Sequence, residues 1–168
     1  SFILMTQMFP SIMLLVPFYK ILSVYGLNNS LVGLCVVYVS FTIPFCSWMM
    51  VGYFRTIPTE IDESAAIDGA SHLQTFWKIA LPLVKPGLVS SAIYAFITCW
   101  NEYMFAAILL VNDKLKTAAV AIAEMNGYYK IAWNDMMAAS LVASVPLIIA
   151  FIFMQKSFIS GLTAGAVK

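Results

Sequence analysis

The sequence predicts an all-α transmembrane protein, a bundle of several membrane-spanning helices. Of the 168 residues, 62% are hydrophobic and only 10% are charged, against about 25% in an ordinary soluble domain. The charges gather in residues 55–85 and 113–135, and long stretches between them carry none. So few charges cannot cover the water-facing surface of a soluble chain. We therefore expect lipid around the chain, and we exclude a soluble enzyme, a nucleic-acid-binding protein and a disordered segment.

Four apolar stretches are long enough to cross a bilayer. A membrane-spanning helix needs about 20 mostly apolar residues, and a helix satisfies its own backbone hydrogen bonds in lipid. The apolar runs are continuous, unlike the alternating pattern of barrel strands. The expected spans are residues 2–22, 31–54, 87–111 and 136–157. Proline disrupts the helical backbone, so we expect kinks at Pro10 and Pro17 in the first span and at Pro44 in the second.

The connections between the spans differ in length. Residues 25–30 form a short Gly- and Asn-containing turn, whereas the connection after the third span is polar and is predicted to carry a short helix at 117–124. The two charged loops have three basic residues each, so only Lys156 and Lys168 decide the positive-inside count. That count favours a cytoplasmic location for the loop 55–86 and for the C-terminus.

The first half of the loop 55–86 predicts a short acidic helix. Thr59 is expected to cap its start with Asp62 three residues later, and acidic residues in the first turn favour a helix N-terminus. Gly69 stands where the helix would end, in a left-handed conformation that glycine adopts at little cost.

A second helix follows directly. Ser71 and Gln74 have the spacing of a capping box, and we expect this helix to run to about Leu81 and to end at Pro82. Two short helices joined at a glycine bend can dock into a groove of another protein. An ordinary solvated loop explains the same residues, and physical reasoning alone leaves both interpretations open.

The loop also resembles the cytoplasmic signature of the permease subunits of ABC importers. That signature is Glu-Ala-Ala, three residues, Gly, nine residues, Ile, any residue and Leu-Pro. Every spacing agrees, and Ser in place of the first Ala is the one difference. The matching residues are Glu63, Ser64, Ala65, Gly69, Ile79, Leu81 and Pro82.

Three further stretches resemble the carbohydrate branch of these permeases. They are Ile67-Asp68-Gly69-Ala70, Trp100-Asn101-Glu102-Tyr103 and the tail 161–168. The resemblance covers the whole chain and implies a partial permease domain over 1–168, of the MetI-like type, with a coupling loop at 55–86. Since this branch usually has six spans, it also implies that two are missing before Ser1.

The resemblance further implies a sugar importer in the bacterial inner membrane. Its partners would be a second permease, ABC ATPase subunits and an extracytoplasmic solute-binding protein. The coupling residues would be the signature residues together with Asp68. The chain has no GxxxxGK phosphate loop, so we expect no enzyme activity, no catalytic residue and no cofactor here, with ATP bound by the separate ATPase. No metal site is expected, because His72 is the single histidine and has no ligands at suitable spacing.

Trp100, Asn101, Glu102 and Tyr103 have two competing roles. Aromatic and amide or carboxylate groups suit a sugar path, but a polar contact between helices explains them as well. A carboxylate such as Glu102 costs about 2.5–3.5 kcal/mol in mid-membrane. One hypothesis is that it pairs with Lys20, and the alternative is that the Lys20 side chain extends to the lipid headgroups. Other readings remain for the whole chain: a permease for glycerol phosphate, an amino acid or a peptide, a non-transporting membrane scaffold, or an intramembrane enzyme.

Overall fold

The computed structural model describes residues 6–127 and 132–166, with side chains to residue 153. The regular elements within these residues are all helical. In chain order they are η1 (Thr6–Met8), α2 (Ser11–Val24), α3 (Leu31–Phe54), α4 (Thr59–Ile67), α5 (His72–Thr75), the π-helical turn η2 (Phe76–Ala80), α6 (Leu81–Leu83), α7 (Lys85–Trp100), α8 (Met104–Leu109), η3 (Asp113–Leu115), α9 (Ala118–Glu124) and α10 (Trp133–Ala166).

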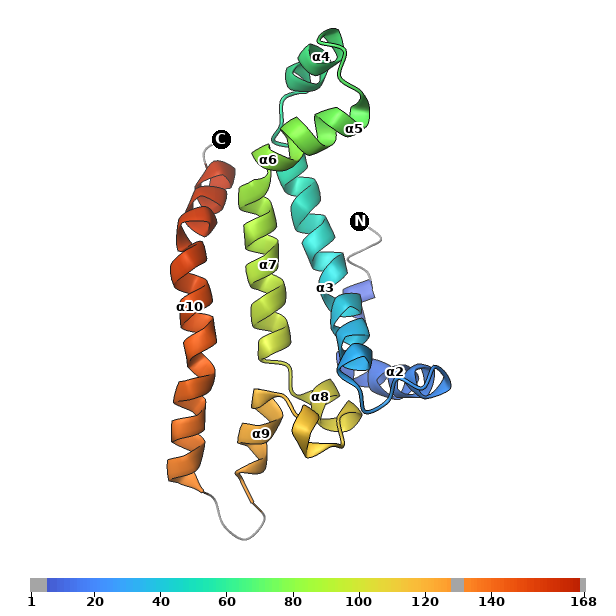
Figure 1. Ribbon diagram of the computed structural model, residues 1–168, viewed down its shortest axis with the longest axis vertical. Coiled ribbons are helices and arrows are strands. Elements are labelled where there is room, and N and C mark those ends of the chain that lie inside the picture. Colours follow the sequence, from blue (N-terminus) through green and yellow to red (C-terminus); the bar gives the residue numbers. More distant parts are fainter. Residues whose placement is uncertain (1–5, 128–131, 167–168) are drawn as a thin grey trace.

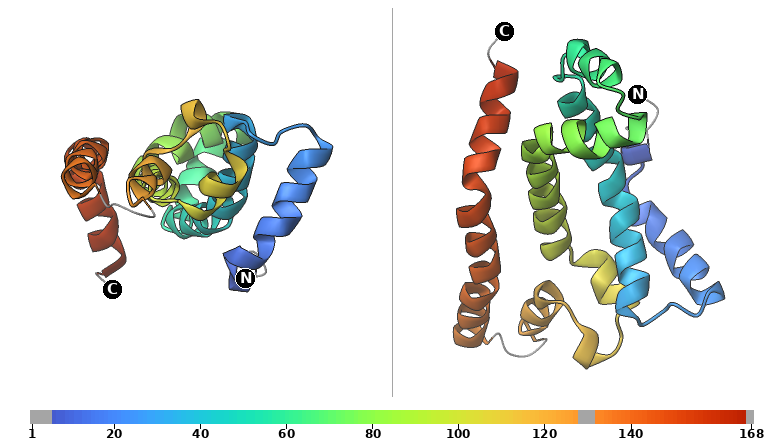
Figure 2. Two further views of the ribbon diagram at one scale, coloured as in Figure 1. Left: turned by 90° about the horizontal axis from the view of Figure 1, so that it is seen from below. Right: turned by 45° about the horizontal axis from the view of Figure 1, so that its top comes forward.

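Three long helices, α3, α7 and α10, run side by side along the long axis of the molecule (Figure 1). The middle helix α7 packs against both of the others. Helices α4 and α5 lie at one end, here called the loop end, and α8 and α9 lie at the other, here called the α8 end. Helix α10 finishes at the loop end, and α2 diverges from the bundle beside α3 (Figures 1 and 2).

The number of spans is smaller than the predicted four in the part of the chain that is described. Helix α3 and the segment Trp133–Phe153 of α10 are long and apolar enough to cross a membrane, and the pair His72–Leu83 and Lys85–Trp100, bent by 69°, makes a third if it is one span. The described part of the chain thus supports two or three spans.

The predicted first and third spans, 2–22 and 87–111, have the wrong bounds. Helix α2 has only 14 residues, short of the roughly 20 that a span needs. Pro10 is the N-cap residue of α2 and precedes the helix instead of kinking it. The predicted third span breaks after Trp100, where the chain leaves the helix and starts α8 at Met104. The predicted turn at 25–30 and the short helix near 117–124 are confirmed.

Small residues bring α3 and α7 together near the loop end. Gly87 is buried against Tyr53 of α3, and a Cβ atom built on Gly87 would lie under 3.0 Å from three atoms of that ring. Ser90 is also buried, with its hydroxyl 3.4 Å from the Tyr53 hydroxyl. Small side chains of this kind let helices in lipid approach closely.

The hydrophobic core lies at the α8 end. Its buried residues come from α2, α3, α8 and α9 and the residue following α8, and they are Leu22, Leu34, Val37, Phe105, Ala106, Leu109, Leu110 and Val120. Phe18, Phe41 and Phe105 pack ring to ring, with centroids 4.9–6.0 Å apart. The Asn29 side-chain oxygen ties the turn to the end of α8 by accepting from the backbone N–H groups of Val111 and Asn112. This packing anchors the residues that follow α7.

Candidate functional site

The segment 55–84 connects α3 to α7 and begins with the acidic helix α4. Pro58 is the N-cap residue, in extended conformation and without a side-chain cap. The prediction that Thr59 caps this helix is wrong, because Thr59 is already its first helical residue. Glu60 and Asp62 lie in the first turn, where negative charge complements the exposed backbone N–H groups.

A Schellman turn at Gly69 ends α4. The N–H of Ala70 donates to the carbonyl of Ala65 (2.9 Å), and the N–H of Gly69 donates to the carbonyl of Ala66 (3.1 Å). Gly69 has a φ of 78°, in the left-handed region as predicted, and no atom lies within 4 Å of a Cβ built there. Glycine is therefore favoured at this position by the backbone conformation. A side chain would find open space there.

The capping box that starts the second helix is confirmed. The Ser71 hydroxyl accepts from the N–H of Gln74 (3.3 Å), and the Gln74 side chain accepts from the N–H of Ser71 (2.9 Å). The helix does not end at Pro82 as predicted. It continues through η2 into α6, where Pro82 is tolerated near the start, and the 69° bend into α7 comes between Leu83 and Lys85.

The predicted coupling residues lie in two groups. Glu63, Ser64, Asp68 and Gly69 are exposed on α4 and its end, and Ala65 is buried, with 4% of its surface exposed. Ile79, Leu81 and Pro82 lie on η2 and α6, next to the start of α7, and of these only Pro82 is exposed. The structure brings the first group together at the tip of the molecule and places the second where the segment joins α7.

The tip also exposes apolar side chains that the sequence reasoning did not single out as contact residues. Ile67 is 87% exposed and Leu73 is 69% exposed, on either side of the Gly69 bend. Large apolar residues within a polar loop were the available signal. A groove of about 820 Å³ runs beside the bend, with Asp62, His72 and Phe76 among its lining residues.

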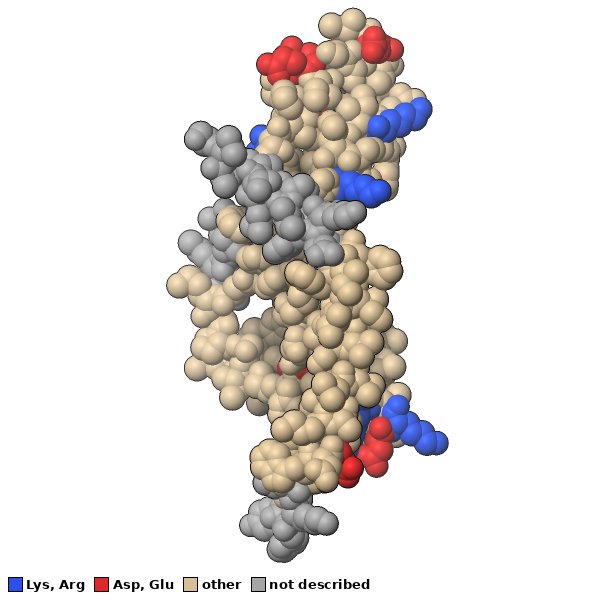
Figure 3. Space-filling model, turned by 90° about the vertical axis from the view of Figure 1, so that its left-hand side faces the viewer, with Lys and Arg blue, Asp and Glu red and all other residues tan. Residues whose placement is uncertain are grey.

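The segment is joined firmly to the helix before it. The rings of Phe54, at the end of α3, and Phe76, at the start of η2, are stacked with centroids 6.0 Å apart. In the face drawn in Figure 3, acidic side chains mark the tip and basic ones lie just below, while the middle of the molecule shows almost no charged atoms. The segment is thus connected to α3 by the ring stack and to α7 by the backbone.

The second candidate region is a cavity of about 840 Å³ between α2, α3, α7 and α8. Its lining combines aromatic rings with polar groups. The polar and aromatic lining residues of the predicted Trp100–Tyr103 stretch are Asn101, Glu102 and Tyr103, and those from elsewhere include Gln7, Ser40, Phe41, Tyr94 and Thr98. Trp100 is not among the lining residues.

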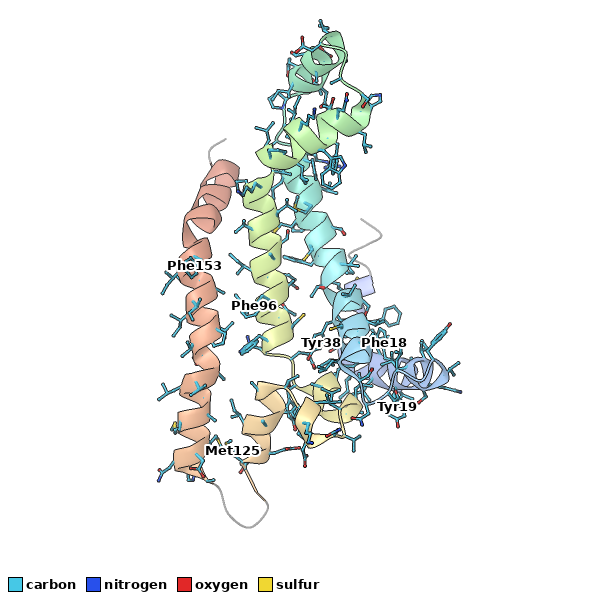
Figure 4. All side chains as sticks on the ribbon, in the orientation of Figure 1. Phe18, Tyr19, Tyr38, Phe96, Met125 and Phe153 are labelled. Atoms are coloured by element: carbon cyan, nitrogen blue, oxygen red, sulfur yellow. The ribbon has the colours of Figure 1, made fainter. Side chains whose placement is uncertain are left out.

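The Glu102 carboxylate lies where α3, α7 and α8 meet. One oxygen accepts from the N–H of Phe105 (2.8 Å), and the other accepts from the N–H of Ala106 (3.1 Å) and from the hydroxyl of Tyr38 (2.9 Å). Tyr38 reaches this point from α3 (Figure 4). The hypothesis that Glu102 pairs with Lys20 is wrong, because Lys20 is exposed and none of the salt bridges within the described residues involves it.

The neighbours of Glu102 point in different directions. The indole N–H of Trp100 donates to the carbonyl of Ala143 on α10 (3.1 Å). The Asn101 amide donates to the carbonyl of Ile97 one turn earlier (2.8 Å), and Tyr103 is 49% exposed. Asn101 and Tyr103, which line the cavity, can offer hydrogen-bonding groups to a polar solute. Within the described residues, no group of three His, Cys, Asp or Glu side chains could hold a metal ion.

Comparison with known proteins finds permease proteins that are similar to this chain over its whole length. A permease protein of the trehalose/maltose transport system of Thermococcus litoralis is 40% identical over 99% of this chain, which spans 60% of that protein. A maltodextrin transport system permease protein of Bacillus subtilis is 39% identical, again over 99% of this chain and 60% of the relative. A putative ABC transporter permease of Streptomyces antibioticus is 36% identical over the full chain, which spans 73% of it.

The family assignment rests on nearly the full length of the sequence. The chain spans about 60% of the length of the Thermococcus litoralis and Bacillus subtilis relatives. A single family model, described as the inner membrane component of binding-protein-dependent transport systems, matches residues 1–163. The chain therefore belongs to the family of binding-protein-dependent transport system inner membrane components.

Proposed function

We propose that this chain is part of the permease subunit of an ATP-driven sugar importer. The observation that carries the proposal is the Glu63–Pro82 signature, folded as an exposed bend at one end of a helical membrane bundle. The family description supplies the inner membrane and the binding protein. Sugar as the solute is supported by relatives named for trehalose/maltose, maltodextrin and sulfoquinovosyl glycerol.

In this proposal the segment 59–82 couples transport to a separate ATPase subunit. Ile67 and Leu73 provide apolar contacts at the tip, and Glu63 and Asp68 provide charge beside them. Closure of the ATPases on ATP moves this tip, and the Phe54–Phe76 stack and the α6–α7 connection pass the motion to α3 and α7. ATP is bound and hydrolysed by the partner, not by this chain.

The same proposal places the loop end and the C-terminus in the cytoplasm. The end of α10 at the loop end, seen in Figure 1, is compatible with that orientation. The α8 end then faces the solute-binding protein. The sugar path runs between this chain and a second permease, and the cavity beside Asn101 and Tyr103 forms part of it, with aromatic and hydrogen-bonding groups that suit a polyol.

Uptake of labelled solutes tests this function. The full-length protein is reconstituted with its second permease, ATPase and binding protein, and maltose, trehalose, glycerol phosphate and an amino acid are compared. Sugar uptake that requires ATP supports the proposal. Uptake of glycerol phosphate or an amino acid instead identifies a permease for another solute.

Co-purification separates a coupled permease from a non-transporting scaffold. The wild-type chain is expected to retain an ATPase subunit in mild detergent, and Glu63→Ala is expected to weaken that retention. Glu124→Ala, in the loop at the α8 end, serves as the control and should retain the ATPase. A chain that never retains an ATPase contradicts the coupling role.

A further inference from the structure

Three consecutive residues at the end of α7 are held in different ways. The indole of Trp100 is bound to α10 at Ala143, three residues before Pro146. Glu102 is bound to Tyr38 of α3 and to the first turn of α8. Asn101, between them, is exposed and borders the cavity. The residues on both sides of Asn101, at the break between α7 and α8, are therefore held by hydrogen bonds to other helices.

The carboxylate of Glu102 is already engaged by the protein. Each of its oxygens accepts from a backbone N–H of α8, and one of them also accepts the Tyr38 hydroxyl. The first N–H groups of a helix have no partner within the helix, and leaving them unpaired away from water is costly. Hydrogen bonds to a charged acceptor are stronger than neutral ones. Pairing the first N–H groups of α8 therefore explains why an acidic residue occurs within apolar sequence.

The neighbouring Asn101 is in a different situation. Its amide nitrogen is held by the carbonyl of Ile97 (2.8 Å), which directs the amide and leaves its carbonyl oxygen as an acceptor at the edge of the cavity. Tyr103 follows directly and lines the same cavity. Both residues lie at the break between α7 and α8, on either side of Glu102, whose hydrogen bonds join α3 and α8 there.

We propose that Glu102 is a positioning residue for the solute path: it holds the α7–α8 break so that Asn101 faces the cavity, and it does not itself bind the sugar. This inference rests on the proposed sugar-permease function. It predicts that loss of the Glu102 contacts changes solute selection through Asn101, and not merely the amount of folded protein.

The test compares uptake of maltose and trehalose in competition, by the complete importer in vesicles at saturating binding protein. Asn101→Ala and Glu102→Gln are each expected to change the ratio of the two uptake rates about fivefold. The double variant is expected to match Asn101→Ala, because both changes act through one group. Glu124→Gln is the control, on α9 outside the cavity, and should leave the ratio unchanged.

A merely structural role for Glu102 would lower both uptake rates equally and keep their ratio, which overturns the inference while sugar transport stands. An additive double variant also overturns it, because Glu102 would then act on the solute independently. Asn101→Ala with an unchanged ratio overturns it as well, together with the proposed role of the cavity.

A second measurement does not depend on transport. Asn101→Cys is introduced into a chain whose own cysteines, Cys35, Cys46 and Cys99, are replaced by Ala. The labelling rate of the new thiol by a membrane-impermeant maleimide is compared with and without Glu102→Gln. We expect that rate to change about threefold or more, and an unchanged rate overturns the inference. If the importer carries no sugar, the proposed function fails, and this labelling still decides the position of residue 101.

Discussion

Replacement of Gly69 by Val is expected to uncouple transport from ATP hydrolysis. Gly69 has a φ of 78° and open space around it, so the cost of a side chain comes from the backbone alone. A left-handed conformation costs a non-glycine residue about 1–2 kcal/mol, and a β-branched residue is especially poor there. At 1.4 kcal/mol per factor of ten, the population of the bend relative to other loop conformations falls about 5- to 30-fold.

The assay measures ATP-dependent sugar uptake and binding-protein-stimulated ATP hydrolysis per folded complex. Gly26→Val is a matched control, because Gly26 also has a left-handed φ, 66°, and nothing within 4 Å, but lies away from the coupling segment. Both variants should lose similar stability, and only Gly69→Val should lose coupling. Gly69→Asn should recover much of it, since Asn tolerates this conformation. Full coupling in Gly69→Val, or equal loss in Gly26→Val, would refute the reasoning.

Two further predictions concern packing and charge. Gly87→Val should destabilise the protein by about 1–3 kcal/mol, because the added atoms collide with the Tyr53 ring; thermal unfolding in detergent measures it. Gly52→Val, at a helical glycine with nothing within 4 Å, is the control, and an equal loss there would contradict the packing argument. The hydrogen bond from Lys116 lowers the pKa of Asp113 below its ordinary 3.8. The stabilisation by this pair is therefore full above pH 3.8 and is lost as the pH falls through the lowered pKa. Lys116→Met should remove that pH-dependent step from the unfolding midpoint, and a step of the same size in the variant would show another origin.

Much of the fold follows from local sequence. The uncharged run 31–54 is long and apolar, and it forms α3 with the predicted bounds. Ser71 with Gln74, and Gly69 in the left-handed conformation, form the predicted cap and bend, because these motifs are satisfied by residues within one or two turns. The family signature was also readable, since its spacing is local and specific.

The errors came where local rules compete with distant contacts. Hydrophobicity predicted continuous spans at 2–22 and 87–111, yet Pro10 precedes a 14-residue helix and the chain breaks after Trp100. The break is stabilised by Tyr38, which is 64 residues away from Glu102 in the chain. No local pattern identifies such a partner.

The sequence by itself determined the membrane class, the bend at Gly69 and the polar stretch at Trp100–Tyr103, because composition, capping and glycine conformation act over short distances. Only the tertiary structure decided what that stretch does in the fold. In the structure, Trp100 donates a hydrogen bond to α10, Glu102 accepts hydrogen bonds from α3 and α8, and Asn101 lines the cavity. The physical reason is that a polar group shielded from water takes whichever partner the packed helices bring within hydrogen-bonding distance. That partner is set by helix packing instead of by neighbours in sequence.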